Sequence, residues 1–152
     1  MQASYLEVDL YDPLVFAGVA LIVLVFGIPI LLHAWIRKAK FNKLPDGYQT
    51  HALRTSIRIE TIVGAAAIAM LAALGIASWV GFNTAWSNLE ANIEQKYHPV
   101  ELNIHEYNGS WIGADITLED GTSFNDVVVE IRDGNEPFIT EVWYHDNPEA
   151  AG

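Results

Sequence analysis

Hydrophobic and polar positions divide the chain into two long apolar runs, a polar stretch between them and a region of alternating residues after them. The first run is centred on Leu14 to Leu32, nineteen positions without a charged or amide side chain. A helix of this length can cross the roughly 30 Å hydrocarbon core of a bilayer. We therefore predict a transmembrane helix over residues 13–36. The alternative is a buried core helix, but 152 residues offer little material to surround a helix that is apolar on every face.

The second apolar run predicts another transmembrane helix, over residues 59–82, with fewer large apolar side chains than the first. Small residues recur in it at every fourth position, which aligns them on one helix face and permits close approach of a second helix. These predicted helix-packing residues are Ala65, Ala69, Ala73, Ala77 and Gly81. Their partner is either a helix of another protein or the first span of this chain, and the sequence leaves both open.

Tryptophans lie near the ends of both spans, as in the aromatic belts of membrane proteins. The predicted membrane-interface anchors are Trp35, Trp79 and Trp86. Gly27 and Pro29 fall within the first span and are interpreted as packing residues at a possible kink.

The stretch between the spans, residues 37–58, determines the predicted orientation. It carries six of the eight basic residues, namely Arg37, Lys38, Lys40, Lys43, Arg54 and Arg58. Because Lys and Arg accumulate in short cytoplasmic loops, we expect this loop to be cytoplasmic and to reverse at Leu44 to Gly47. Both termini are then extracytoplasmic. Residues 1–12 lack the basic start of a signal peptide, so we expect the first span to remain as an anchor.

Residues 83–147 have the pattern of a small extracytoplasmic domain. Apolar residues at helical spacing continue the second span outward as an amphipathic helix as far as Pro99. Alternating residues then predict four strands, over residues 100–105, 111–118, 123–131 and 138–144. The turn signals between them are Asn108-Gly109, Asp120-Gly121 and Asp133-Gly134.

The predicted fold class is thus an α+β membrane protein: a transmembrane helical hairpin with an extracytoplasmic domain of one helix and a four-stranded antiparallel meander. A sheet that is apolar on one face must cover it with the helix or with a partner, and so small a domain makes docking on a partner the expected outcome. The tail, residues 148–152, has no periodicity and is predicted to be disordered.

Charge limits the classes of partner. Residues 83–152 carry fourteen acidic side chains against Lys96 and Arg132, a net charge of −12. Such a surface argues against nucleic acid, which needs a basic patch, but it can attract a basic extracytoplasmic protein. Membrane lipids are expected to contact the basic loop. There is no cysteine, which excludes disulfides and thiolate chemistry.

Candidate chemistry is sparse. His33 is within reach of the membrane interior, but a haem held by two histidines would need a second one. His98, His105 and His145 lack metal-ligand spacing. Glu60 lies beside Arg58 at the cytoplasmic edge of the second span and is interpreted as forming a local ion pair or as snorkelling to the interface, rather than as a proton relay. No catalytic motif occurs, so we predict neither an enzyme, nor a cofactor, nor a metal site.

These features favour a non-catalytic accessory subunit of a larger integral membrane complex in the inner or plasma membrane. Its acidic domain would dock on the extracytoplasmic face, and a bacterial respiratory electron-transfer assembly is the leading example, by analogy alone. The first alternative is a free-standing membrane sensor or binding module with an extracytoplasmic ligand-binding domain. The second is a small membrane protein that inhibits or excludes another component.

Overall fold

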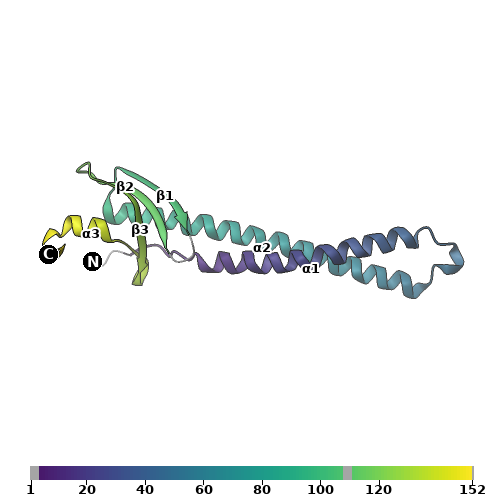
Figure 1. Cartoon of the computed structure of the whole chain (residues 1–152). Helices are drawn as coiled ribbons and strands as arrows, with labels where there is room; N and C mark the ends of the chain where they lie inside the picture. Colours follow the sequence, from purple (N-terminus) through teal and green to yellow (C-terminus); the bar gives the residue numbers. More distant parts are fainter. Residues whose placement is uncertain (1–3, 108–110, 152) are drawn as a thin grey trace. The chain divides into compact units, whose positions relative to one another are not determined.

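A computed structural model describes residues 4–107 and 111–151. In this part of the chain it contains three α-helices and a four-stranded antiparallel sheet, so the predicted mixed α+β class is confirmed (Figure 1). Contacts divide the chain into two compact units. One is Asp12–Val80, which we call the helix pair. The other, which we call the terminal unit, combines the chain up to Tyr11 with the chain from Gly81 onward.

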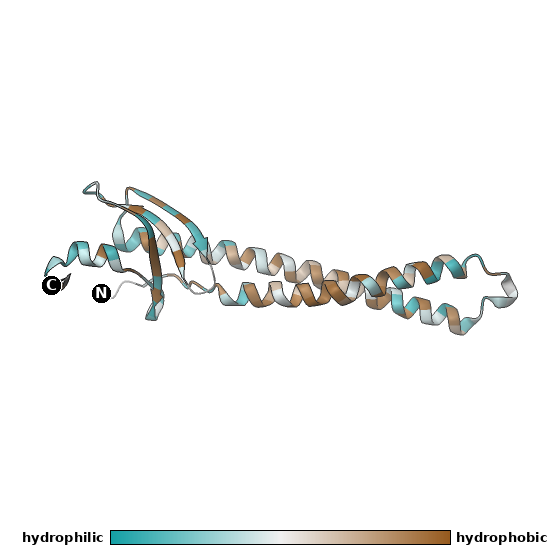
Figure 2. Cartoon of the chain, in the orientation of Figure 1, coloured by the Kyte–Doolittle hydropathy of each residue, from teal (hydrophilic) through white to brown (hydrophobic). Residues whose placement is uncertain are grey.

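The helix pair is formed by α1 (Tyr11–Phe41) and the first part of α2 (His51–Tyr97). They are joined by a short connection with a 3-10 turn, η1 (Asp46–Tyr48), where the sequence predicts the reversal. Both helices are long and apolar enough to cross a membrane, and their most apolar 18-residue windows are only 11% and 6% buried within the chain. Figure 2 shows the apolar residues concentrated along the middle of both helices. Neither is therefore the buried core helix of this chain.

The two helices meet along a seam that repeats every seven residues. In α1 the buried positions are Pro13, Ala20, Gly27, Ala34 and Phe41. In α2 the corresponding positions are buried Ile57, Gly64 and Ser78, with half-buried Leu71 between them. A seven-residue repeat keeps one face of each helix against its neighbour, as in coiled coils. Small side chains at most of these positions let the two backbones approach closely.

Two glycines set the closest approach. A Cβ atom on Gly27 would lie 2.8 Å from Cβ of Ala67, and one on Gly64 would lie 2.9 Å from Cβ of Leu31. Either substitution would therefore push the helices apart. Nearer the start of α1, the buried Ser78 hydroxyl donates a hydrogen bond of 2.8 Å to the carbonyl of Pro13. α1 continues through Pro29 without ending there.

In the terminal unit, the sheet is the predicted meander. Its strands are β1 (Glu101–Tyr107), β2 (Ile112–Thr117), β3 (Ser123–Arg132) and β4 (Glu136–Ile139), and each pairs antiparallel with the next. Ile112, Ala114 and Ile116 of β2 are all buried, as the alternation predicts. The turn glycines Gly121 and Gly134 have φ of 85° and 77°, the left-handed conformation that glycine adopts without strain. The predicted turn at Asn108-Gly109 lies outside the described residues.

The fourth predicted strand is wrong in its second half. Only Glu136–Ile139 is a strand, and Thr140–Asp146 forms a helix, α3. Buried Ile139 and Val142 are three residues apart, and a helical turn after the strand brings both into the same core. The apparent alternation from Phe138 to Tyr144 did not reflect burial. The stretch predicted to be disordered contains a 3-10 turn, η3 (Pro148–Ala151).

The sheet covers its apolar face with α2. Leu89 and Ile93 of that helix are at most 1% exposed and belong to one core with buried residues of β2, β3 and β4. Burial of a side chain of this size contributes about 1.5–3 kcal/mol. Figure 1 shows the sheet lying along the last turns of α2. Of the two ways to cover the sheet, the chain uses its own helix.

The start of the chain is held in the terminal unit by asparagines. The Asn92 amide, fully buried on α2, accepts a hydrogen bond from Leu6 N and donates one to Leu6 O, both at 2.8 Å. One turn earlier, Asn88 donates to the carbonyl of Glu7 at 2.7 Å. Asn135, after β3, accepts from Val8 N at 3.1 Å. Leu10 follows and is buried in the core.

Replacement of this buried amide tests the attachment. Asn92→Ala should destabilise the terminal unit by about 1–3 kcal/mol, because both backbone groups of Leu6 lose their partner in a partly buried position. Thermal unfolding of the full chain in detergent micelles, followed by circular dichroism, measures the effect. Gln95→Ala, at an exposed position on the same helix, is the matched control. Equal stability of the two variants would contradict this role of Asn92.

Candidate functional site

A cluster of polar side chains joins the two helices towards their connecting loop. Arg37 of α1 is half-buried and forms an ion pair with Glu60 of α2, and it also donates a hydrogen bond of 3.2 Å to the Ser56 hydroxyl. His33 Nδ1 lies 3.5 Å from Glu60 Oε2. That carboxylate oxygen is buried and accepts no hydrogen bond within the described part of the chain.

The contacts of this cluster link α1 to α2 and so favour one register between them. Arg37 is always protonated and satisfies one oxygen of Glu60. Sliding one helix along the other by a turn would separate the pair and leave a charge in apolar surroundings. The side chain of His33 remains 65% exposed. The cluster therefore specifies how α1 aligns on α2.

The interpretation of Glu60 as a partner of Arg58 is wrong. Residues two apart on a helix do not face each other, so Arg58 points elsewhere. The ion pair instead crosses between the helices to Arg37. The signal was present in the sequence, because His33 and Arg37 are four apart in the first helix and Ser56 and Glu60 are four apart in the second. Each pair lies on one helix face, but that the two faces meet depends on how the helices pack, which the sequence pattern does not give.

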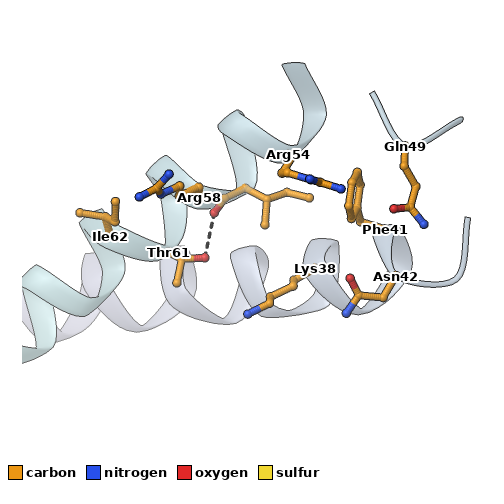
Figure 3. Close-up of a pocket in the computed structure, with 9 residues that line it drawn as sticks. Lys38, Phe41, Asn42, Gln49, Arg54, Arg58, Thr61 and Ile62 are labelled. Carbon is orange, nitrogen blue, oxygen red and sulfur yellow. Dashed lines mark hydrogen bonds between the residues drawn. The ribbon is translucent and has the colours of Figure 1, made fainter. Parts of the chain in front are cut away.

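Three other basic residues line a cavity of about 420 Å³ at the loop end of the helix pair, shown in Figure 3. They are Lys38 from α1 and Arg54 and Arg58 from α2. The Arg54 guanidinium carbon lies 5.8 Å from the centre of the Phe41 ring, an arrangement typical of a cation–π contact. Lys40 and Lys43 are exposed and do not line the cavity.

The predicted helix-packing residues do not pack on the first span. Ala65, Ala69, Ala73 and Ala77 are all exposed, because the seam with α1 uses a different face of α2. Gly81 is half-buried. The alternative that this chain's own first span covers the alanine face is therefore wrong. We call Ala65, Ala69, Ala73 and Ala77 the alanine face.

The predicted tryptophan anchors differ in their surroundings. Trp35 and Trp79 are each 69% exposed on the helix pair, as a side chain at a membrane interface would be. Trp86 is half-buried and packs against the core of the terminal unit. Its position at the end of an apolar run resembles that of an anchor, but its packing partners come from the sheet domain, which the local sequence does not show.

Two carboxylates of the terminal unit accept hydrogen bonds from backbone N–H groups at a bulge and at a turn. β2 and β3 pair with a bulge opposite Asp115, where Asp126 has a φ of 56°. The Asp126 N–H donates a hydrogen bond of 2.8 Å to Asp115 Oδ1, and this bond, with lesser help from Asn103 and His105, lowers the pKa of Asp115. The N–H and hydroxyl of Thr122 likewise lower the pKa of Asp120 in the next turn. Both carboxylates therefore stabilise the local backbone conformation.

An ion pair in the last turn of α2 also stabilises the terminal unit. Lys96 Nζ lies 2.7 Å from Glu136 Oε1 and donates to the carbonyl of Pro137 at 2.7 Å. The Lys96 ammonium therefore lowers the pKa of Glu136. Beside it, the Tyr97 hydroxyl accepts a hydrogen bond from Ile139 N at 2.9 Å. Both side chains attach the short edge strand β4 to the end of the helix.

Two of the three histidines of the terminal unit each lie beside a single carboxylate, and His98 has no ion pair among those described. His105 Nε2 lies 3.4 Å from Asp115, and His145 Nε2 lies 2.9 Å from Asp120. Within residues 4–107 and 111–151, no group of three or more histidine or carboxylate side chains is placed to hold a metal ion. The candidate features are therefore the cluster at Glu60, the alanine face, the basic cavity, and a cavity of about 460 Å³ in the terminal unit.

A double-mutant cycle tests the interhelical ion pair. Arg37→Gln and Glu60→Gln should show a coupling energy of about 1–3 kcal/mol, because the charged hydrogen bond between them is partly removed from solvent. Unfolding of the detergent-solubilised chain in increasing sodium dodecyl sulfate measures it. Arg58→Gln with Glu60→Gln is the matched control and should be additive. Stronger coupling to Arg58 than to Arg37 would refute the observed pairing.

Acid should destabilise the terminal unit. The unfolded chain protonates its carboxyls near pH 4, before the folded chain protonates Asp115, Asp120 and Glu136, whose pKa values are lowered. Stability is therefore fully present above about pH 4 and is lost as pH falls through the folded-state pKa values. Melting temperatures from pH 6 to pH 2.5 test this. Asp115→Asn should make the dependence shallower, and an unchanged slope would contradict the role of Asp115.

Comparison of the chain with protein-family models, with curated proteins and with solved structures finds no match. Function is therefore inferred from the residues described above and from their physical chemistry.

Proposed function

We propose that the chain is a non-catalytic accessory subunit of a larger integral membrane complex, anchored by two spans. One observation carries this proposal: the alanine face of α2 is exposed although the chain has a helix of its own available to cover it. In a bilayer, small residues in register gain little from lipid tails but allow a second backbone to approach closely. The face is therefore better suited to a helix of another protein than to lipid.

Membrane insertion is supported by the exposure of the apolar helices. Large side chains along α1, including Leu21, Val25 and Phe26, are more than half exposed within the chain. A patch of this size in water would drive aggregation, whereas in a bilayer it faces hydrocarbon. The clustering of basic residues near the loop favours a cytoplasmic loop.

The hydrogen bonds of the first residues support an orientation with both ends on the same side. Residues before Tyr11 pack in the same unit as the sheet, and two apolar helical segments separate these parts in the sequence. Two crossings return the chain to the side from which it started. With the loop cytoplasmic, the terminal unit is extracytoplasmic.

The terminal unit would contact its partner through its acidic exterior. Its sheet is already covered by α2, so the need to cover the apolar face no longer argues for a partner. The excess of negative charge from residue 83 onward remains, and it favours a basic surface on another extracytoplasmic protein or subunit. A bacterial respiratory electron-transfer assembly is retained as the example, and it rests on analogy alone.

A sensor is the second candidate, because the terminal unit has a cavity of about 460 Å³ between the start of the chain and the sheet. Val8, Leu10, Tyr107 and Trp111 are among its lining residues. This volume is within the range of small-molecule sites. As a sensor, the chain would act without a partner complex and the cavity would bind an extracytoplasmic ligand.

Substitution on the alanine face distinguishes these functions. Ala73→Leu should reduce recovery of partner subunits about 5- to 10-fold in a mild-detergent pull-down on a C-terminal tag, because the larger side chain blocks close helix approach. Mass spectrometry against the tagged chain itself measures the ratio. Membrane insertion should persist, since leucine is more apolar than alanine.

Ala72→Leu is the matched control. This alanine is also exposed, and it lies about 100° around the helix from Ala73. It should leave the recovery unchanged. If the wild-type chain is recovered only by itself, the accessory role is wrong and the sensor reading replaces it. Equal loss with both variants would show that the alanine face is not the contact.

A further inference from the structure

The basic cavity at the loop end of the helix pair continues into an apolar groove. A second hollow of about 310 Å³ is lined by Leu31, Leu32 and Trp35 of α1, together with Lys38 and Thr61. Lys38 and Thr61 also line the basic cavity. The two hollows therefore share a border on the same side of the helix pair, and one elongated molecule can occupy both.

The cavity is suited to a negatively charged group. Lys38, Arg54 and Arg58 line it, and its other described lining residues include no carboxylate. The nearby Glu60 is already paired with Arg37. In Figure 3 these basic side chains come from both helices, with the Arg54 guanidinium directed to Phe41 and that of Arg58 extending towards Ile62. Asn42 and Gln49 lie on the loop side. Amides and guanidinium groups can donate hydrogen bonds to phosphate oxygens.

The order of the two hollows along the helices matches the order of groups in a phospholipid. The basic cavity lies at the loop end, beside Phe41 and Arg54. The groove lies one to two turns further along α1, at Leu31 to Trp35, and so deeper in the apolar part of the helix. A head group at the loop end would place an acyl chain along the groove. Burial of each CH₂ group there contributes about 0.8 kcal/mol.

We propose that this composite site binds one anionic phospholipid, with its phosphate among Lys38, Arg54 and Arg58 and an acyl chain against Leu31, Leu32 and Trp35. Basic pockets between membrane helices are suited to such head groups. The site does not require a protein partner, so it holds whether or not the accessory role is correct. It would fix the tilt and depth of the helix pair through a lipid rather than through a protein contact.

Native mass spectrometry of the delipidated full-length chain tests the proposal. Phosphatidylglycerol and phosphatidylcholine with identical acyl chains are added at equal concentration. The wild-type chain should bind one phosphatidylglycerol and prefer it. Arg54→Gln with Arg58→Gln should weaken that binding about 30-fold, since each cation near an anionic head group contributes a factor of about five. Both arginines are exposed, so the fold should persist, and circular dichroism checks it.

The matched control is Lys40→Gln with Lys43→Gln, which removes the same charge from the same loop but outside the cavity. Its phosphatidylglycerol binding should stay within about threefold of wild type, since exposed charges that lie away from the head group act only through screened attraction. Equal weakening by both double variants would overturn the site in favour of general attraction to the loop.

Glycerol phosphate, which has no acyl chain, separates a lipid from a free anion. It should bind far more weakly than the lipid, and Trp35→Ala should weaken only the lipid. If glycerol phosphate binds as well as the lipid, or if phosphatidylcholine binds as well as phosphatidylglycerol, the proposal is wrong.

Discussion

Close approach of α1 and α2 along the seven-residue seam is the constraint on which the other features depend. Gly27 and Gly64 leave no room for a Cβ atom, so this close approach depends on glycine at both positions. Packing on this face brings Arg37 to Glu60 and leaves the alanine face exposed. It also places Lys38 in the same cavity as Arg54 and Arg58. The interhelical ion pair then selects one alignment along the seam. Packing and electrostatics thus agree on a single arrangement, as expected for a sequence with one preferred structure.

A second constraint acts in the terminal unit, where the Asn92 side chain forms hydrogen bonds with both backbone groups of Leu6. Its side-chain amide offers one donor and one acceptor to Leu6, which is the hydrogen bonding that a sheet edge would provide. The start of the chain is therefore tied to residues more than eighty positions later. This attachment has a consequence for a membrane protein, because a chain end fixed to the terminal unit cannot lie on the opposite side of the bilayer.

Periodicity predicts the elements well where one face is buried. The alternation of Ile112, Ala114 and Ile116 identifies β2, and the uncharged run of α1 identifies a long apolar helix. It fails at α3, where Val142 alone is buried and four residues cannot distinguish a strand from a helical turn. The heptad of small residues in the first span was also visible, but large apolar side chains around it obscured it. Contacts such as Asn92 with Leu6, or Arg37 with Glu60, depend on the tertiary arrangement and have no local signal.

The proposed function requires that the helix pair crosses a membrane and that the loop and the chain ends are exposed on opposite sides of it. The absence of cysteine makes single-cysteine labelling a direct test. Gly47→Cys, Glu7→Cys and Glu149→Cys are compared in right-side-out and inverted vesicles with a membrane-impermeant maleimide. We predict that the Gly47 position labels only in inverted vesicles and that both other positions label only in right-side-out vesicles. Labelling of all three positions from the same side would contradict it.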